Sequence, residues 1–114
     1  MSEAEYERKV RDRQVYVAQI NGEPVGVLRY NLFWDNTPFC NLLYVKEGYR
    51  GIGIGRRLMT RFEDDMREAG YSFVLTSTQS NEEAQYFYRA IGYLDCGELH
   101  LPEESVELIL RKDL

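Results

Sequence analysis

Residues 49–58 read Tyr49-Arg50-Gly51-Ile52-Gly53-Ile54-Gly55-Arg56-Arg57-Leu58, and they join an apolar, strand-like run to an amphipathic, helix-like one. Three glycines within five residues let the backbone turn tightly and approach a ligand closely. The helix that follows presents unpaired N–H groups and the positive end of its dipole, which together form an anion site. Arg50, Arg56 and Arg57 add positive charge. The stretch therefore predicts a strand–loop–helix unit that binds phosphate.

The spacing of the glycines decides which phosphate loop this is. A P-loop requires a lysine after its last glycine, and the dinucleotide fingerprint requires a third glycine where Arg56 stands. What remains is Arg-x-x-Gly-x-Gly, formed by Arg50, Gly53 and Gly55. Taken alone, the same glycines could merely turn a strand into a helix. The loop resembles the pyrophosphate loop of the GNAT superfamily of N-acetyltransferases.

A second motif lies downstream and is independent of the loop. The superfamily carries a helix written Asn-x-x-Ala-x-x-Phe-Tyr-x-x-x-Gly, followed by an aromatic residue. The matching residues here are Asn81, Ala84, Phe87, Tyr88, Gly92 and Tyr93. The run Leu43-Tyr44-Val45 also ends five residues before Arg50, as the family pattern expects. The resemblance covers about residues 15–111 and implies the GNAT-like acyl-CoA N-acyltransferase fold, with acetyl-CoA as cofactor.

The resemblance implies a role for each matching residue. The backbone amides of residues 52–57 are expected to bind the pyrophosphate, Asn81 to contact the pantetheine or phosphate arm, and Tyr88 to face the thioester sulfur. Strand 39–45 is expected to splay from strand 72–77, so that the pantetheine pairs along its free edge. No metal ligand is expected, and Tyr88 is the implied catalytic residue. The implied cofactor-binding residues are Leu43, Tyr44, Val45, Arg50, Gly51, Ile52, Gly53, Ile54, Gly55, Arg56, Asn81 and Tyr88.

Tyr88 also has a chemical argument of its own. Aminolysis of a thioester expels a thiolate whose conjugate acid has a pKa of about 8.5, and a phenol of pKa about 10 can donate a proton to that sulfur. The alternative is a core aromatic on the apolar stripe of its helix, where phenylalanine would serve equally well. The hydroxyl therefore favours the catalytic role.

The remaining pattern predicts one α/β (α+β) domain over residues 1–114, with a mixed, mostly antiparallel sheet and helices on both faces. Asn21-Gly22 marks a hairpin turn, and strand 39–45 is expected to be central and covered on both faces. Ser80 and Glu83 form a capping box before the second amphipathic helix. The expected elements are a helix at 3–12, strands at 14–20, 25–33, 39–45, 72–77, 93–99 and 105–111, and helices ended by Gly70 and Gly92.

Composition limits the class of partner. The chain has 114 residues, is 44% hydrophobic and carries a net charge of −5 spread along its length. A diffuse negative field argues against nucleic acid and suits a cationic acceptor such as an amine. Cys40 and Cys96 are expected to be buried or half-buried free thiols in a reducing compartment. A charged N-terminus without a membrane-length apolar run predicts a cytoplasmic protein with no membrane partner.

The sequence departs from the family pattern at its N-terminus. Fourteen residues precede Val15, where the family has a strand and two helices that help to wall the acceptor site. The acceptor side is then open, completed by a partner subunit, or non-functional. Strand 14–20 would lie at the sheet edge, with neither charge nor proline in residues 15–20, which predicts a homodimer.

No general base is evident. Asp35 and Glu47 flank strand 39–45 and are candidates, proton removal through water is equally compatible, and His100 reads as a surface residue. Three functions therefore stand: transfer of the acetyl group of acetyl-CoA to a primary amine of a small molecule, peptide or protein; a catalytically degenerate acyl-CoA-binding module; and a structural domain with a glycine turn. The intact Tyr88 and Asn81 favour the first.

Overall fold

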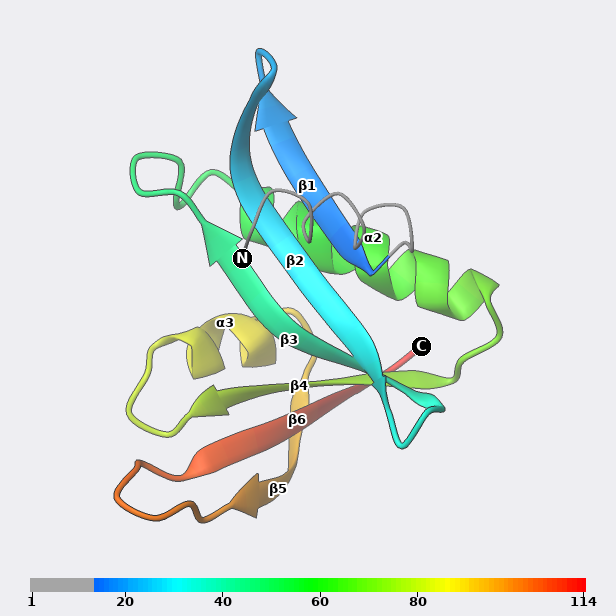
Figure 1. The fold of residues 1–114 in the computed structure, drawn as a ribbon, viewed down its shortest axis with the longest axis vertical. Coiled ribbons are helices and arrows are strands. Elements are labelled where there is room, and N and C mark those ends of the chain that lie inside the picture. Colours follow the sequence, from blue (N-terminus) through cyan, green and yellow to red (C-terminus); the bar gives the residue numbers. More distant parts are fainter. Residues whose placement is uncertain (1–13) are drawn as a thin grey trace.

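The computed structural model describes residues 14–114, which form a six-stranded sheet and two helices (Figure 1). The strands lie in the order β1-β2-β3-β4-β6-β5, and every neighbouring pair is antiparallel except β3 and β4. The predicted mixed, mostly antiparallel fold is confirmed, whereas the helix expected at 3–12 lies outside the described residues. The elements are β1 (Val15–Ile20), β2 (Glu23–Phe33), β3 (Thr37–Val45), α2 (Ile54–Glu68), β4 (Phe73–Gln79), α3 (Ala84–Ala90), β5 (Leu94–Leu99) and β6 (Glu107–Asp113).

The hairpin between β1 and β2 follows from two residues. Asn21 and Gly22 have φ values of 52° and 81°. Positive φ at both central positions gives the two-residue turn whose twist matches that of the strands it joins, and asparagine and glycine adopt such φ values at low cost. The predicted hairpin is confirmed.

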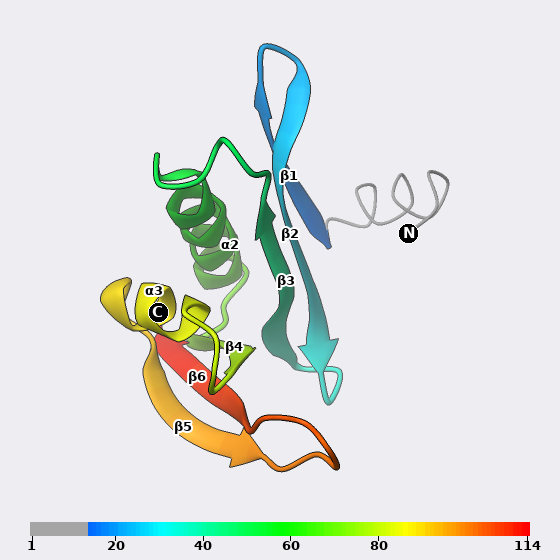
Figure 2. The ribbon, with the colours of Figure 1, turned by 90° about the vertical axis from the view of Figure 1, so that its left-hand side faces the viewer.

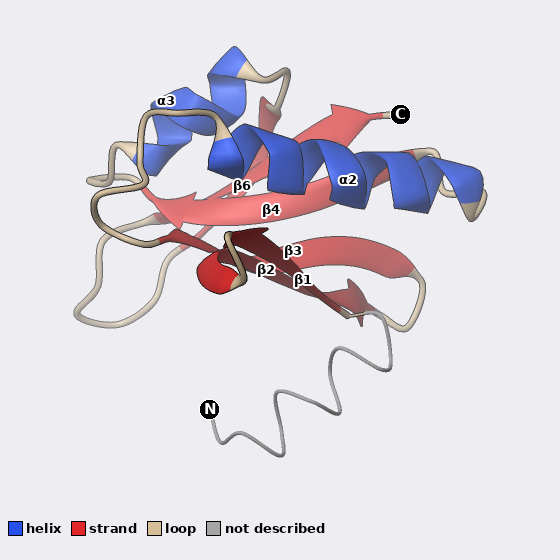
Figure 3. Cartoon of the chain, turned by 90° about the horizontal axis from the view of Figure 1, so that it is seen from above, coloured by secondary structure: helices blue, strands red, loops and turns tan. Residues whose placement is uncertain are grey.

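Both described helices pack on the same face of the sheet (Figure 3). Leu58, Met59, Phe62 and Met66 form the buried stripe of α2, and they share one core with Tyr88 of α3. The sequence predicted helices on both faces, whereas the two helices of residues 14–114 cover one.

The start of α2 lies directly against the sheet at Gly26 of β2. A Cβ atom at this position would lie 3.0 Å from Ile54 Cγ2 and 3.2 Å from Leu58 Cδ1. The absence of a side chain at Gly26 therefore lets the first turn of α2 approach β2 closely. This contact positions the loop that precedes α2.

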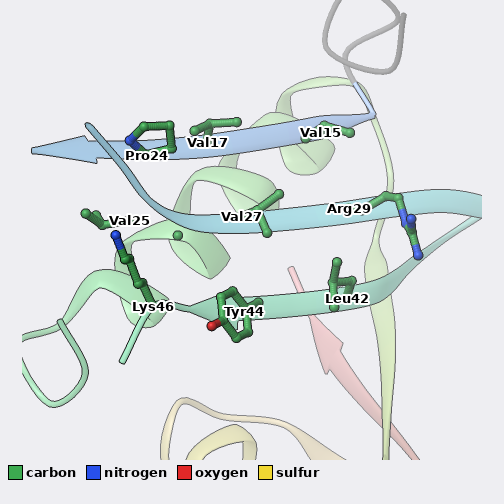
Figure 4. A pocket seen from close by; sticks show the side chains of 10 residues that line it. Val15, Val17, Pro24, Val25, Val27, Arg29, Leu42, Tyr44 and Lys46 are labelled. Atoms are coloured by element: carbon green, nitrogen blue, oxygen red, sulfur yellow. The ribbon is translucent and has the colours of Figure 1, made fainter. Parts of the chain in front are cut away.

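The other face of β1–β3 carries apolar side chains that no described helix covers (Figure 4). Val17, Val27 and Tyr44 follow one another across the three strands in register. Leu42 is 36% exposed and Tyr44 is 48% exposed. β3 is internal to the sheet as predicted, but the prediction that both of its faces are covered is not met within residues 14–114, because both helices of this region pack on one side.

β3 and β4 separate along their length (Figures 1 and 2). They pair in parallel only at Phe39↔Leu75 and Cys40↔Thr76. The register of β3 with β2 skips Asn41, which marks a bulge. Because a bulge bends its strand, residues 41–45 leave β4 and keep a free edge. The expected splay is present, and α3 packs on the helix side of the sheet beside it, where it shares a cavity with β3.

Candidate active site

The opening between β3 and β4 contains two adjoining cavities. The loop cavity, of about 790 Å³, extends from the glycine loop to α3. The slot, of about 250 Å³, lies between the diverging strands. Leu43, Ala84 and Tyr88 line both cavities, so Tyr88 stands where they meet. The loop cavity is lined by Leu43, Val45, Tyr49, Arg50, Gly51, Gly53, Ile54, Gly55, Arg56, Glu83, Ala84, Phe87, Tyr88, Ala90 and Ile91. The slot is lined by Cys40, Asn41, Leu42, Leu43, Thr76, Ser77, Thr78, Glu82, Ala84, Tyr88 and Glu107.

The loop before α2 has the backbone of an anion site. Gly51 and Gly53 have φ values of 79° and 90°, which residues other than glycine rarely adopt. Gly53 caps α2 with no side-chain hydrogen bond, and the first turn contains no acidic residue. The first intrahelical bond runs from the Arg57 amide to the Gly53 carbonyl at 3.0 Å, so the amides before it are free for a ligand. The positive end of the helix dipole lies in the same place.

The Arg50 side chain joins the start of this loop to the end of β3. Its Nε donates to the carbonyl oxygen of Val45 at 2.8 Å, which ties the end of β3 to the start of the glycine turn. Its guanidinium lies 5.7 Å from the centre of the Tyr44 ring. The side chain therefore holds the loop shape while lining the cavity.

Tyr88 is buried between the helices and the sheet, with 6% of its surface exposed. Its ring meets the ring of Tyr93 edge-on, with 5.7 Å between centroids. Burial raises the pKa of the Tyr88 phenol well above its usual range, and Cys40 adds to the rise, while a hydrogen bond with Thr76 opposes it. The phenol therefore keeps its proton at neutral pH and can act as a donor at the junction of the cavities.

Cys40 lines the slot, and its thiol stays protonated at neutral pH. It is buried, and burial raises the pKa of its thiol to about 12. Its carbonyl oxygen accepts a hydrogen bond from the Thr76 hydroxyl at 3.1 Å. Both cysteines are free, as predicted, but Cys96 is exposed, so the expectation that both thiols are buried or half-buried is wrong for Cys96.

The structure gathers most of the expected site residues around the loop cavity. Three expected residues do not line it. Tyr44 points its side chain to the opposite face, where it lines another groove. Ile52 is 65% exposed. Asn81 is exposed in the turn before α3 and lines neither the loop cavity nor the slot.

The predicted capping box at the start of α3 is wrong. The helix begins at Ala84, and Glu83 at its N-cap makes no side-chain cap bond. Gln85 instead stabilises the turn before the helix, since its Nε2 donates to the carbonyl oxygens of Ser80 and Glu82, both at 2.8 Å. The buried Gln85 side chain thus shapes the turn that borders the slot.

A buried ion pair supports the site from behind. Glu63 of α2 is 4% exposed and accepts hydrogen bonds from Tyr93 Oη at 2.8 Å and Lys112 Nζ at 2.9 Å. Glu63 was not among the predicted site residues, although its position on α2 is a signal. Glu63 lies four residues after Met59 and three before Met66, so a carboxylate stands on the buried stripe of α2. Such a carboxylate requires partners.

The slot is lined by polar residues that were not predicted as site residues, among them Thr76, Ser77, Thr78, Glu82 and Glu107. The earlier general-base candidates, Asp35 and Glu47, line neither the slot nor the loop cavity. His100 is exposed, and its Nε2 lies 3.1 Å from Glu98 Oε1. His100 lines neither the slot nor the loop cavity.

Two further observations on the described residues concern metal ions and membranes. Within residues 14–114, no group of three or more metal-binding side chains is arranged to hold an ion. No helix in that same part of the chain is both long enough and apolar enough to cross a lipid bilayer.

A glycine loop at a helix N-terminus, next to a parallel strand pair that opens beside a buried tyrosine, defines the acyl-CoA N-acyltransferase fold class that the sequence resembled. The profile of the acetyltransferase (GNAT) family matches residues 1–93, and the chain belongs to this family. An uncharacterized N-acetyltransferase of Methanocaldococcus jannaschii is 36% identical over 83 residues, which are 70% of this chain and 52% of the relative. The chain thus spans about half the length of that curated relative.

Solved structures share the fold. Ard1 from Thermoplasma volcanium has a TM-score of 0.85 at 21% identity, covering 100% of this chain and 80% of that one. A ribosomal-protein-alanine N-acetyltransferase from Brucella melitensis has a TM-score of 0.80 at 25% identity, covering 97% and 75%. A GNAT family acetyltransferase from Elizabethkingia anophelis with acetyl-CoA bound has a TM-score of 0.76 at 17% identity, covering 99% and 84%.

Proposed function

We propose that this protein is an N-acetyltransferase that transfers the acetyl group of acetyl-CoA to a primary amine. The observation that carries the proposal is the meeting of the loop cavity and the slot at Tyr88. One end of the combined groove is a helix N-terminus with free amides, and the other end opens between β3 and β4. A long ligand with phosphates at one end and a reactive thioester at the other suits this groove. Membership of the acetyltransferase family supports the same reading.

The groove offers acetyl-CoA two kinds of contact besides Tyr88. The amides at the start of α2 would bind the pyrophosphate, where Gly51 and Gly53 let the backbone come close. The free edge of residues 43–45 would pair with the amides of the pantetheine arm, because β4 has already turned away. Leu43, Val45 and Phe87 provide apolar walls between these two regions.

Acetyl-CoA supplies an acetyl group activated as a thioester. Tyr88 is the general acid of the transfer, since its proton is held by burial and its ring stands at the junction of the cavities. The acceptor must react as a neutral amine. A lysine-like amine with a pKa of about 10.4 requires about 4.6 kcal/mol for deprotonation at pH 7, whereas an α-amino group of pKa about 8 requires about 1.4 kcal/mol. A peptide α-amine is thus the less costly acceptor, and the Brucella neighbour is named for that class of substrate.

Two measurements test the function. Calorimetry should show coenzyme A binding, and a thiol-release assay should show turnover of acetyl-CoA with at least one amine from a panel of small amines and peptide N-termini. Binding without turnover on the whole panel would favour the alternative of an acyl-CoA-binding module. Absence of coenzyme A binding would refute both.

The proposal includes a homodimer formed through β1. β1 is at one end of the described strand order, and residues 15–20 carry neither charge nor proline. An edge strand of this kind can pair with another chain. The apolar side chains of Val17, Val27, Leu42 and Tyr44 lie on the adjoining face and add a reason for association (Figure 4).

A further inference from the structure

Two carboxylates border the slot at which acetyl transfer is proposed. Glu82 lies in the turn between β4 and α3, and Glu107 begins β6. Both line the slot together with Tyr88. Neither forms a salt bridge with a cation in the described part of the chain. The slot is therefore lined by two carboxylates that form no ion pair within residues 14–114.

A buried hydroxyl without a partner lines the same slot. Thr78 is 5% exposed, and its Oγ1 forms no hydrogen bond within residues 14–114. Thr76 is also buried, two residues earlier on the same strand, and its hydroxyl is satisfied by the carbonyl oxygen of Cys40. A buried hydroxyl left unpaired is unfavourable, so Thr78 has hydrogen-bonding capacity that a ligand in the slot can use.

The carboxylates reach the slot from different sides of the sheet. Thr76 and Thr78 face the helices, so by the alternation of a strand Gln79 faces the other way. Glu107 is the partner of Gln79 in the pairing of β4 with β6 and shares its face. Glu82 instead precedes α3 on the helix side, and its charge is felt by Tyr88. An amine that enters between β3 and β4 from the open face passes Glu107 before it reaches Tyr88.

We propose that Glu107, Glu82 and the Thr78 hydroxyl form the acceptor's ammonium site, which selects cationic primary amines and accepts their proton. This inference rests on the proposed function and identifies the acceptor side of the same site. Glu107 takes one proton from the ammonium, and the neutral nitrogen forms the C–N bond with the acetyl carbon. The C–S bond breaks with its electron pair on sulfur, which receives the proton of Tyr88. The second proton of the nitrogen returns to Tyr88 through water, and Glu107 releases its proton to solvent.

The site can be tested by binding alone. The probes are 4-fluorobenzylamine, a cation at pH 7, and 4-fluorobenzyl alcohol, a neutral molecule of nearly the same shape. Fluorine NMR titrations are carried out on the full chain saturated with coenzyme A. The amine should bind about tenfold more tightly than the alcohol, because hydrogen bonds to charged groups are the stronger ones. Combining Glu82→Gln with Glu107→Gln should reduce the amine affinity to that of the alcohol.

Matched variants separate the site from general surface charge. Glu104→Gln removes an exposed carboxylate from the loop between β5 and β6 and should leave both affinities unchanged. Thr78→Val keeps the shape of the side chain, removes its hydroxyl and should weaken amine binding severalfold. A wild-type protein that binds the two probes equally, or an amine affinity that the Glu82 and Glu107 changes leave intact, overturns the site.

The coenzyme A titration keeps the two hypotheses apart. Wild-type protein that fails to bind coenzyme A refutes the proposed function. Wild-type protein that binds coenzyme A but does not distinguish amine from alcohol refutes the ammonium site alone. Should the double variant fail to fold, as judged by circular dichroism, Glu82→Gln and Glu107→Gln are titrated singly, and an amine affinity that neither change lowers overturns the site.

Discussion

Replacing Gly55 by alanine is expected to change stability and cofactor affinity in opposite directions. Gly55 lies in the first turn of α2. An added Cβ would lie 3.6 Å from Phe87 Cζ and 3.7 Å from both Leu43 Cδ2 and Val45 Cγ2, which are ordinary contacts. The methyl group therefore fits the folded chain. Alanine in place of a helical glycine contributes about 0.5–1 kcal/mol, or about 2–5 °C in Tm for a chain of this size.

The same methyl group takes up room in the loop cavity. Gly55 lines that cavity together with Leu43, Val45 and Phe87, so the methyl group narrows the passage between α2 and β3. A ligand forced against one extra methyl group loses about 1–3 kcal/mol, as overpacked cores do. The expected rise in Kd for coenzyme A is therefore about 5- to 150-fold.

Thermal unfolding and calorimetry on the same preparation measure both effects. Thr60→Ala is the matched control, because Thr60 is exposed on α2 away from the loop cavity. That change also gains helix propensity, about 0.5 kcal/mol, and should leave coenzyme A affinity unaltered. A Gly55→Ala protein that is stabilised and binds coenzyme A like the wild type would show that the cofactor does not pass this residue. The assignment of the loop cavity would then be refuted.

Four further outcomes are expected. Tyr88→Phe should lower kcat about 100-fold with little change in KM, because the ring stays and the proton donor is lost; steady-state kinetics at the wild-type rate would make Tyr88 a core residue only. Gly53→Val should weaken coenzyme A binding far more than Gly48→Val does. The two positions have φ values of 90° and 92°, so both changes carry a similar strain of about 1–3 kcal/mol. Equal losses of coenzyme A affinity, measured by calorimetry, would point to strain instead of ligand contact. Lys112→Met should lower the free energy of unfolding by about 3–5 kcal/mol, since buried Glu63 keeps an unpaired charge. Adding Glu63→Gln should restore most of the lost stability. Urea titrations in which the double variant is no more stable than Lys112→Met would contradict the charge argument. Sedimentation equilibrium at micromolar concentration should give the mass of a dimer, and a monomer would remove the pairing of β1.

Much of the binding loop could be predicted because its chemistry is local. Gly51 and Gly53 adopt positive φ values, and the helix predicted after them begins at Ile54. The turn at Asn21-Gly22 follows from its own backbone preferences in the same way. The capping box failed although it is also a local motif: α3 begins at Ala84 with Glu83 as its N-cap, and the turn before it is held by hydrogen bonds from Gln85 to the carbonyl oxygens of Ser80 and Glu82.

Burial was harder to predict from the pattern of residues. The apolar run in β3 reads as a strand covered twice, yet Leu42 and Tyr44 face away from both described helices. A run of apolar residues reports that a strand is hydrophobic, and it carries no information on which face a helix covers. Asn81 shows the same limit, since its motif spacing is correct while its side chain lies outside both cavities.

By itself, the sequence determined the order of the elements, the glycine loop and the tyrosine on α3, because these depend on residues close together in the chain. The slot depends on distant pairings instead. The bulge at Asn41 parts β3 from β4, and the register of β6 sets Glu107 beside Gln79 at the end of β4. Tyr88 and Glu107 are far apart in sequence, and both line one cavity only because β4 pairs with β3 on one side and with β6 on the other. Long-range register is decided by the packing of the whole sheet, so the slot exists only in the tertiary structure.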